Sequence, residues 1–135
     1  MKYKKVLCLN PYYKEATAAM GFFPPTGLEY VATAMEKYVG EIILIDLRLE
    51  SEYDNIDRLK EFIIREIDLV CVSINWSYYF KDVCDLVNLL PDDTPLVIGG
   101  QQATAHVEEL FKTCSNINII VTNGVIYNSL QIGIT

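Results

Sequence analysis

The sequence has no run of about twenty apolar residues, which is the length that a membrane-spanning helix requires. The apolar stretch near its start ends at Asn10-Pro11, so it is too short for the core of a signal peptide. We therefore expect a cytoplasmic protein without a membrane span.

Basic residues are also few. Eleven lysines and arginines stand against 18 aspartates and glutamates, which gives a formal net charge of −7. Nucleic-acid binding depends on cationic side chains that displace counterions from phosphates, and a protein of this charge repels a phosphate backbone on average. We expect no nucleic acid among its partners.

Familiar catalytic and metal-binding motifs are absent as well. The sequence has no P-loop and no GxSxG, and His106 is its single histidine. Its four cysteines show no CxxC or CxxxCxxC spacing, so we expect reduced, mostly buried thiols, with a disulfide pair as the alternative. We predict no catalytic residue and no metal ligand in this chain, and we expect His106 to be a solvated residue within a helix.

What the sequence does contain is a regular alternation of short apolar runs with amphipathic stretches. The runs are apolar at consecutive positions, which is typical of strands that are covered on both faces. The predicted strands are 4–10, 41–46, 68–74, 95–100 and 117–124, and the predicted helices are 26–39, 54–65, 78–90 and about 104–112. For 135 residues this order predicts one α/β domain with a flavodoxin-like (Rossmann-like) five-stranded parallel sheet, order 2-1-3-4-5, and helices on both faces.

The first predicted helix has an explicit beginning after the stretch FFPP. Thr26 and Glu29 have the spacing of a capping box, in which each side chain bonds the backbone of the other residue. Apolar stripes at helical spacing are formed by Leu28, Val31, Met35 and Tyr38 or Val39 in this helix, and by Ile56, Leu59, Phe62 and Ile63 in the next. We expect the loop from Tyr12 to Pro25 to stand over the binding edge of the sheet.

Residues 125–135, VIYNSLQIGIT, do not continue the pattern. They carry no charge and lack a clear polar face, whereas a flavodoxin-like domain places an amphipathic helix after its fifth strand. The tail is either a poor last helix or the end of a fragment whose sheet face another domain or a second subunit completes. We favour the fragment or oligomer, and take 1–124 as the α/β domain.

Small and polar residues end several of the predicted strands. Ligands of open parallel sheets bind at these carboxyl ends, where glycine lets the backbone come close and a serine hydroxyl can donate or accept. The residues at the ends are Asn10 to Tyr13, Asp46, Ser73 to Trp76, Gly99 to Gln102, and Asn123-Gly124. Each could be structural on its own, but their joint placement predicts a slot for a flat, partly polar group. Asp46 leaves a weaker alternative, a nucleotide-binding enzyme, for which the GxGxxG motif is missing.

Several of these segments together resemble a known family. CLNPYY, GFFPPTGLEYVATAME, ILIDLR, LVCVSI and VIGGQQAT are similar to the N-terminal cobalamin-binding domain of cobalamin-dependent radical S-adenosylmethionine proteins. That group includes the magnesium-protoporphyrin IX monomethyl ester oxidative cyclase of anaerobic organisms and related methyltransferases. The resemblance covers about Lys5 to Thr104. Gln102 stands where the family usually has histidine, and NGVIYNSL replaces its glycine-glutamate run after the fifth strand.

The resemblance implies a cobalamin site. The loop from Tyr12 to Pro25 would border the corrin ring, Ser73 would meet the nucleotide tail, and Gly99 and Gly100 would let the tail pass close to the backbone. The implied cofactor-binding residues are Asn10, Pro11, Tyr12, Tyr13, Ser73, Ile74, Trp76, Gly99, Gly100, Gln102 and Gly124. The implied state of the cofactor is tail-out, because no histidine of this chain stands near the first strand to bind the cobalt.

The resemblance also implies a partner. An iron-sulfur cluster that activates S-adenosylmethionine needs three cysteines at CxxxCxxC spacing, which this chain lacks, so the cluster is expected in a radical S-adenosylmethionine domain in cis or in trans. We expect a cobalamin-binding module of a larger enzyme of the oxidative cyclase or methyltransferase type, without catalytic residues of its own. The alternative is a degenerate flavodoxin-like domain that binds no cofactor and assembles through its sheet face, for example as a homodimer.

Overall fold

The computed structural model describes residues 3–13, 26–122 and 125–128, without the side chains of Thr26 and Tyr30. The predicted capping bond of Thr26, most of the loop from Tyr12 to Pro25, and Gly124 therefore lie outside the described residues.

One six-stranded sheet organises the chain. The strands are β1 (Lys5–Asn10), β2 (Glu41–Asp46), β3 (Leu69–Ser73), β4 (Leu96–Gly99), β5 (Ile119–Val121) and β6 (Ile126–Asn128). They lie in the order β2-β1-β3-β4-β5-β6. The first five are parallel, as predicted, whereas β6 pairs antiparallel with β5.

The sixth strand corrects the predicted five-stranded sheet. Ile126 and Tyr127 favour strands, and Asn123-Gly124 is the residue pair preferred between the strands of tight hairpins. The backbone N–H of Thr122 donates to the Val125 carbonyl oxygen at 2.8 Å, which closes the start of this pairing. The beginning of the tail thus extends the sheet edge.

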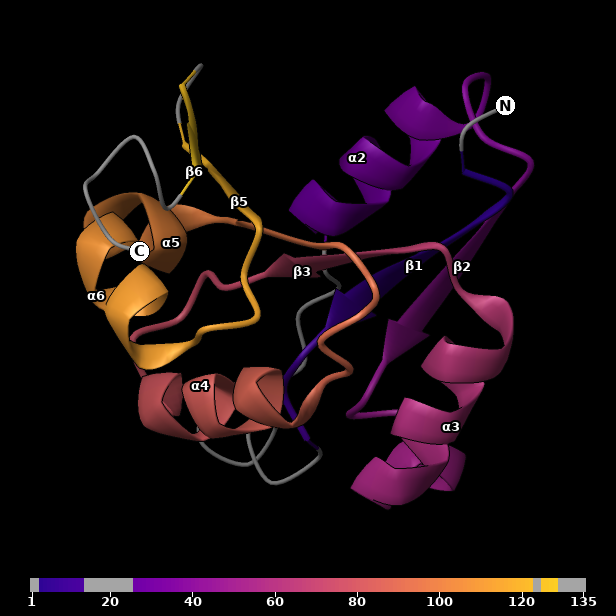
Figure 1. The fold of residues 1–135 in the computed structure, drawn as a ribbon, viewed down its shortest axis with the longest axis horizontal. Helices are drawn as coiled ribbons and strands as arrows, with labels where there is room; N and C mark the ends of the chain where they lie inside the picture. The colour runs from indigo at the N-terminus through magenta and orange to yellow at the C-terminus, as the bar shows by residue number, and fades with distance from the viewer. Residues whose placement is uncertain (1–2, 14–25, 123–124, 129–135) are drawn as a thin grey trace.

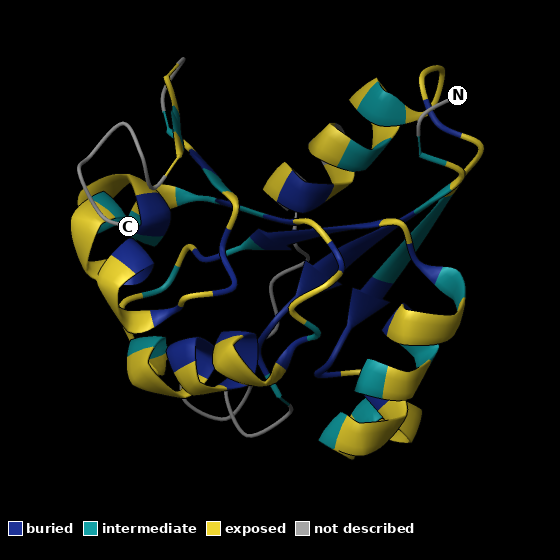
Figure 2. Cartoon of the chain, viewed as in Figure 1, coloured by how far each residue is buried: buried dark blue, intermediate teal, exposed yellow. Residues whose placement is uncertain are grey.

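Helices cover both faces of the sheet, which explains the continuous apolar runs. The helices are α2 (Thr26–Met35), α3 (Ile56–Glu66), α4 (Phe80–Leu89), α5 (Gln101–Ala105) and α6 (Val107–Thr113), with a 3₁₀ turn η1 at Ser51–Tyr53. Figure 1 shows α2 on one side of the strands and α3 and α4 on the other. The buried residues form two clusters, a large one that includes α3, α4 and α6 and a smaller one under α2. Figure 2 shows that β1 and β3 are buried along most of their length.

The apolar stripe of α3 is confirmed. Leu59 and Ile63 are completely buried, while Ile56 and Phe62 are half-buried against the same core. Asn55 caps the helix by accepting from the backbone N–H of Asp57 at 2.8 Å.

The stripe of the first helix is only partly confirmed. Leu28 and Val39 are buried and Met35 packs against them, but Val31 is 46% exposed and Tyr38 is 66% exposed. The prediction that Val31 belongs to the buried stripe is therefore wrong. This side chain turns toward an open part of the sheet face, which is described below.

The predicted helix at about 104–112 begins earlier and is interrupted. Helix α5 starts at Gln101, and His106 has φ −132° and ψ 38°, which separates α5 from α6. The His106 ring lies 5.0 Å from the Phe80 ring, and its Nδ1 lies 3.1 Å from Oε2 of Glu109. His106 is thus half-buried at a helix break, which corrects the solvated helix residue that the sequence suggested.

All four cysteines are buried and free, as the thiol interpretation predicted. Cys8 and Cys71 are direct neighbours on β1 and β3. Within residues 3–13, 26–122 and 125–128, every helix is too short or too polar to cross a membrane.

Candidate functional site

A cleft of about 510 Å³ opens at the carboxyl ends of β3, β4 and β5, on the face of the sheet that carries α2. It forms because α2 covers the β1 side of this face and leaves the β4 and β5 side open. The lining residues are Gly27, Leu28, Val31, Cys71, Val72, Ser73, Asn75, Val97, Gly99, Gly100, Gln101, Thr104, Val121 and Thr122. We call this space the β3–β5 cleft.

The walls of the β3–β5 cleft are mostly apolar, and the described lining residues carry no charge. Val31 and Val121, 46% and 38% exposed, face it from α2 and from β5. Cys71 lies on its floor, where a hydrogen bond with the neighbouring Cys8 thiol and burial raise its pKa, so it lines the cleft as a neutral thiol. None of the described lining residues is aspartate, glutamate, lysine or arginine.

Two glycines keep the strand ends open, for different reasons. Gly100 has φ +103°, and a Cβ there would lie 2.5 Å from the Ile74 carbonyl oxygen and 2.7 Å from Oδ1 of Asn75. This position therefore requires glycine. A Cβ at Gly99 would have the Val121 carbonyl oxygen as its nearest neighbour, at 3.8 Å. The backbone at position 99 therefore does not require glycine. The absence of a side chain at Gly99 leaves room in the cleft.

A polar network joins the end of β3 to the start of α5. Nδ2 of Asn75 donates to Oγ of Ser73 at 2.9 Å, and the backbone N–H of Gln101 donates to Oδ1 of Asn75 at 3.1 Å. The next N–H, of Gln102, donates to the Ile74 carbonyl oxygen at 2.9 Å. The Ser73 hydroxyl is thereby held at the cleft wall.

The structure thus brings together some of the predicted site residues and separates others. Ser73, Gly99 and Gly100 meet in the cleft, whereas Ile74 is completely buried and Gln102 is half-buried outside the lining. Sequence reasoning did not select nine of the lining residues for this site, namely Gly27, Leu28, Val31, Cys71, Val72, Val97, Thr104, Val121 and Thr122. The sequence gives no signal for Val31 at this site, because its exposure depends on how far α2 covers the sheet.

Tyr12 and Trp76, which follow β1 and β3, contact each other. The Tyr12 hydroxyl accepts from the Trp76 backbone N–H at 3.1 Å and donates to its carbonyl oxygen at 3.4 Å, and the two rings lie 4.6 Å apart. Burial raises the pKa of the Tyr12 phenol, although the hydrogen bonds from the backbone oppose this. Neither aromatic residue is part of the cleft lining, so the pair does not fill the cleft.

We expect Tyr12→Phe to lower the free energy of unfolding by about 1.5 kcal/mol, because a partly buried N–H and carbonyl lose their partner while the ring remains. Urea denaturation measures the change. Tyr78→Phe is the control, since Tyr78 is 67% exposed and should change stability by less than about 0.5 kcal/mol. Equal effects of the two substitutions would contradict the role given to the Tyr12 hydroxyl.

Asn10 and Asp46 lie away from the cleft in a buried polar cluster. Nδ2 of Asn10 donates to Oδ1 of Asp46 at 3.1 Å, and the Arg48 guanidinium contacts both carboxylate oxygens, the closer at 2.7 Å. Burial alone would raise the pKa of Asp46, but the hydrogen bonds from Arg48 and Asn10 hold it below its ordinary value. Both oxygens of Asp46 are occupied within the protein, which disfavours the ribose-binding alternative.

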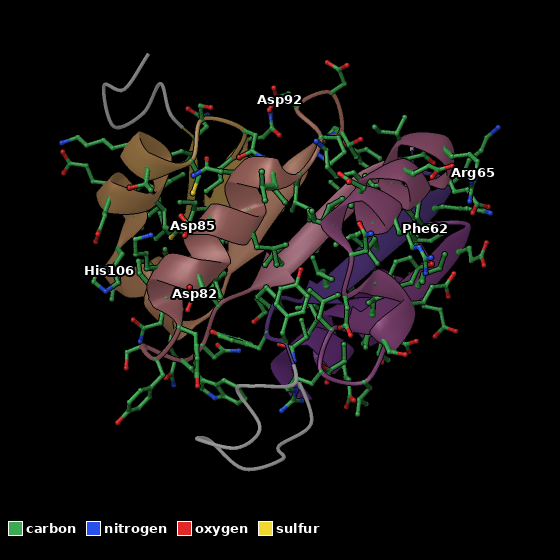
Figure 3. All side chains as sticks on the ribbon, turned by 90° about the horizontal axis from the view of Figure 1, so that it is seen from below. Phe62, Arg65, Asp82, Asp85, Asp92 and His106 are labelled. Atoms are coloured by element: carbon green, nitrogen blue, oxygen red, sulfur yellow. The ribbon has the colours of Figure 1, made fainter. Side chains whose placement is uncertain are left out.

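A second cavity, of about 730 Å³, lies on the opposite face of the sheet. Its lining residues are Pro11, Tyr12, Tyr13, Asp54, Ile56, Tyr79, Asp82, Val83, Asp85, Leu86 and Leu89. Figure 3 shows Asp82 and Asp85 along α4 on the side turned to the viewer. Three carboxylates disfavour a phosphate group here, in contrast to the uncharged β3–β5 cleft.

Comparison with known proteins agrees with this architecture. No family model matches the chain. The radical S-adenosylmethionine methyltransferase TsrM from Kitasatospora setae, solved with cobalamin and a 4Fe-4S cluster bound, superimposes with a TM-score of 0.71 over 87% of this chain, at 20% identity. The chain shares this part of the TsrM fold. The predicted α/β fold class is therefore confirmed, with the sixth strand as its correction.

A curated relative is similar in sequence. Hopanoid C-3 methylase from Methylococcus capsulatus (strain ATCC 33009 / NCIMB 11132 / Bath) is 30% identical over an alignment 109 residues long that covers 78% of this chain. The chain spans only 21% of that methylase and 22% of the TsrM chain. The matched segment is thus a small part of both larger proteins.

Proposed function

We propose that this chain is a cobalamin-binding module of a larger radical S-adenosylmethionine enzyme, and that the β3–β5 cleft receives the nucleotide tail of the cofactor. The observation that carries the proposal is the open, uncharged cleft formed where Ser73, Gly99 and Gly100 end neighbouring strands. The shared fold supports it, because TsrM was solved with cobalamin bound.

The described residues fit such a group. The volume of the cleft, about 510 Å³, lies within the range of roughly 300–1,000 Å³ that is usual for small-molecule sites. Val31, Val97 and Val121 offer apolar walls to a flat ring, and Ser73 offers a hydroxyl. The space beside Gly99 is free of other atoms to 3.8 Å.

Each part of the chain would have a distinct role. Ser73 and the two glycines would hold the tail, while Pro11, Tyr12 and Tyr13 after β1 would border the corrin ring. We propose the tail-out state without a histidine ligand from this chain, because His106 is engaged with Phe80 and Glu109 at a helix break. The bound cofactor would supply the cobalt chemistry, and this chain would bind and orient it.

We propose a methyltransferase as the parent enzyme. The names of both similar proteins refer to methyl transfer, whereas an oxidative cyclase has support only from the sequence resemblance. The iron-sulfur cluster would belong to a radical S-adenosylmethionine domain, in cis or in trans, that acts on the cofactor held here.

Titration with hydroxocobalamin followed by desalting tests the proposal. The unsubstituted chain should retain the corrin absorbance, and Ser73→Leu should weaken binding by at least about tenfold, because a larger side chain occupies the cleft. Thr33→Leu, on the exposed surface of α2, is the matched control and should bind normally. Loss of all corrin absorbance from the unsubstituted chain on desalting would remove the proposal.

One observation favours the alternative function, a flavodoxin-like domain that binds no cofactor and assembles with another chain. Val125 and Ile126 at the β6 edge are 45% and 61% exposed, and an exposed apolar edge strand is a surface for pairing with another chain. Under this alternative, sedimentation should show a stable dimer that Ile126→Lys dissociates and that cobalamin does not affect. A monomer at all concentrations would exclude it.

A further inference from the structure

Three side-chain hydroxyl groups among the described residues line the β3–β5 cleft, those of Ser73, Thr104 and Thr122. The Thr104 hydroxyl donates to the Gly100 carbonyl oxygen at 3.1 Å, and the Thr122 hydroxyl donates to the Val125 carbonyl oxygen at 3.2 Å. A hydroxyl has one hydrogen to donate, so these two threonines have none left for a ligand. Among these three hydroxyls, Ser73 is therefore the candidate donor.

Asn75 determines what the Ser73 hydroxyl can do. The Asn75 amide lies between Oγ of Ser73 and the backbone N–H of Gln101, at 2.9 Å and 3.1 Å. The two ends of an amide group look alike, but a backbone N–H can only donate. The end that faces Gln101 must therefore be the oxygen, and the end that faces Ser73 must be the NH₂ group.

The direction of this bond leaves the hydrogen of the Ser73 hydroxyl for a ligand. Its oxygen accepts from Asn75, and the hydroxyl donates to no residue in the described parts of the chain. The surrounding wall is apolar, with Cys71 and Val97 on the neighbouring positions of the sheet face. A ring that lies against Cys71 and Val97 thus meets a directed donor at Ser73.

We propose that Asn75 is a specificity-determining residue, which fixes Ser73 as a donor so that the cleft selects rings with an unprotonated nitrogen or a carbonyl oxygen as acceptor. The inference rests on the proposed function only in placing a flat ring in the cleft. Asn75 acts through Ser73, and its role is to position that hydroxyl.

Asn75→Asp separates this role from the structural one. Aspartate has nearly the same shape, and its carboxylate still accepts from the Gln101 N–H, so the connection to α5 is kept. A carboxylate cannot donate, however, so the Ser73 hydroxyl must donate to it instead. The fold is retained while the donor toward the cleft is lost.

The test uses two matched rings, 1-methylbenzimidazole and 1-methylindole, which have the same fused shape and differ in the ring nitrogen that can accept. NMR titration of the whole chain, without cobalamin, gives the ratio of their dissociation constants. We expect the unsubstituted chain to prefer 1-methylbenzimidazole over 1-methylindole. This preference should be about fivefold smaller in Ser73→Ala, which is the effect expected from the loss of one net hydrogen bond. Comparing the unsubstituted chain with Ser73→Ala cancels the contribution from the difference in hydrophobicity between the two rings.

Two further variants complete the test. Asn75→Asp should show the same ratio as Ser73→Ala, whereas Thr104→Val should keep the ratio of the unsubstituted chain, because the Thr104 hydrogen is already bonded to Gly100. An unchanged ratio in Ser73→Ala or in Asn75→Asp would overturn the inference, and so would binding of neither ring. Should Asn75→Asp fail to fold, the Ser73→Ala comparison still decides whether the donor exists, and Asn75→Gln then tests its positioning.

The outcome is separable from that of the proposed function. A chain that prefers 1-methylbenzimidazole but does not retain hydroxocobalamin would contradict cobalamin binding and support the donor. A chain that retains hydroxocobalamin without any ring preference would overturn only the inference about Asn75.

Discussion

Gly100→Ala is expected to lower the free energy of unfolding by about 3 kcal/mol and to abolish cobalamin retention, as measured by urea denaturation and by corrin absorbance after desalting. Gly100 has φ +103°, which side chains with a Cβ rarely adopt, and the added carbon would lie 2.5 Å from the Ile74 carbonyl oxygen. The strand end must shift to relieve this contact. That shift would disturb the Asn75 bridge as well, since Oδ1 of Asn75 lies 2.7 Å from the same point.

Gly99→Val is the matched control, one residue away in the same pair. Its Cβ has no neighbour closer than 3.8 Å, and valine is well suited to a strand, so stability should change by less than about 0.5 kcal/mol. Cobalamin binding should nevertheless weaken at least about tenfold, because the side chain enters the cleft. Equal stability loss in both variants, or normal binding by Gly99→Val, would contradict the different roles given to the two glycines.

Asp46→Asn is expected to lower the free energy of unfolding by about 3 kcal/mol at pH 7. The Arg48 side chain is completely buried, and its guanidinium contacts the Asp46 carboxylate at 2.7 Å. Without that carboxylate a buried cation loses its charge partner, although the shape of the side chain is kept. Asp85→Asn is the control, because Asp85 forms an exposed pair with Lys81 and should cost less than about 1 kcal/mol.

The effect of Asp46→Asn should depend on pH in a defined direction. The folded state holds the pKa of Asp46 below its ordinary value, so the ionised carboxylate contributes stability above the unfolded pKa near 3.8. This contribution is lost as the pH falls through the folded pKa. Unfolding measured from pH 7 downward should therefore show the difference between the two proteins shrinking below about pH 4. A difference that stays constant or grows on acidification would contradict the charge interaction.

The sheet was largely predictable because its signal is local. Continuous apolar runs such as residues 6–9 indicate strands covered on both faces, and the alternation with helices determines parallel pairing. The sixth strand escaped prediction because its three residues lie within the uncharged segment 125–135, which resembles a poor last helix. The pair Asn123-Gly124 was the available signal for a hairpin.

The candidate site was predictable only in outline. Ser73, Gly99 and Gly100 could be placed together because they end neighbouring strands of a parallel sheet. Val31 could not be placed there, because its position depends on how far α2 covers the sheet. Asn75 could be placed at the end of β3, but its role depends on one side-chain hydrogen bond across the strand end. The break at His106 also depends on tertiary contacts, namely those with Phe80 and Glu109.

The most direct test of the central claim is to locate bound cobalamin on the chain by NMR. Titrating ¹⁵N-labelled protein with hydroxocobalamin should shift the backbone amide signals of Ser73, Gly99, Gly100 and Gln101, which surround the β3–β5 cleft. Binding that leaves these four signals unchanged and shifts only those of Asp54, Asp82 and Asp85 around the opposite cavity would contradict the account.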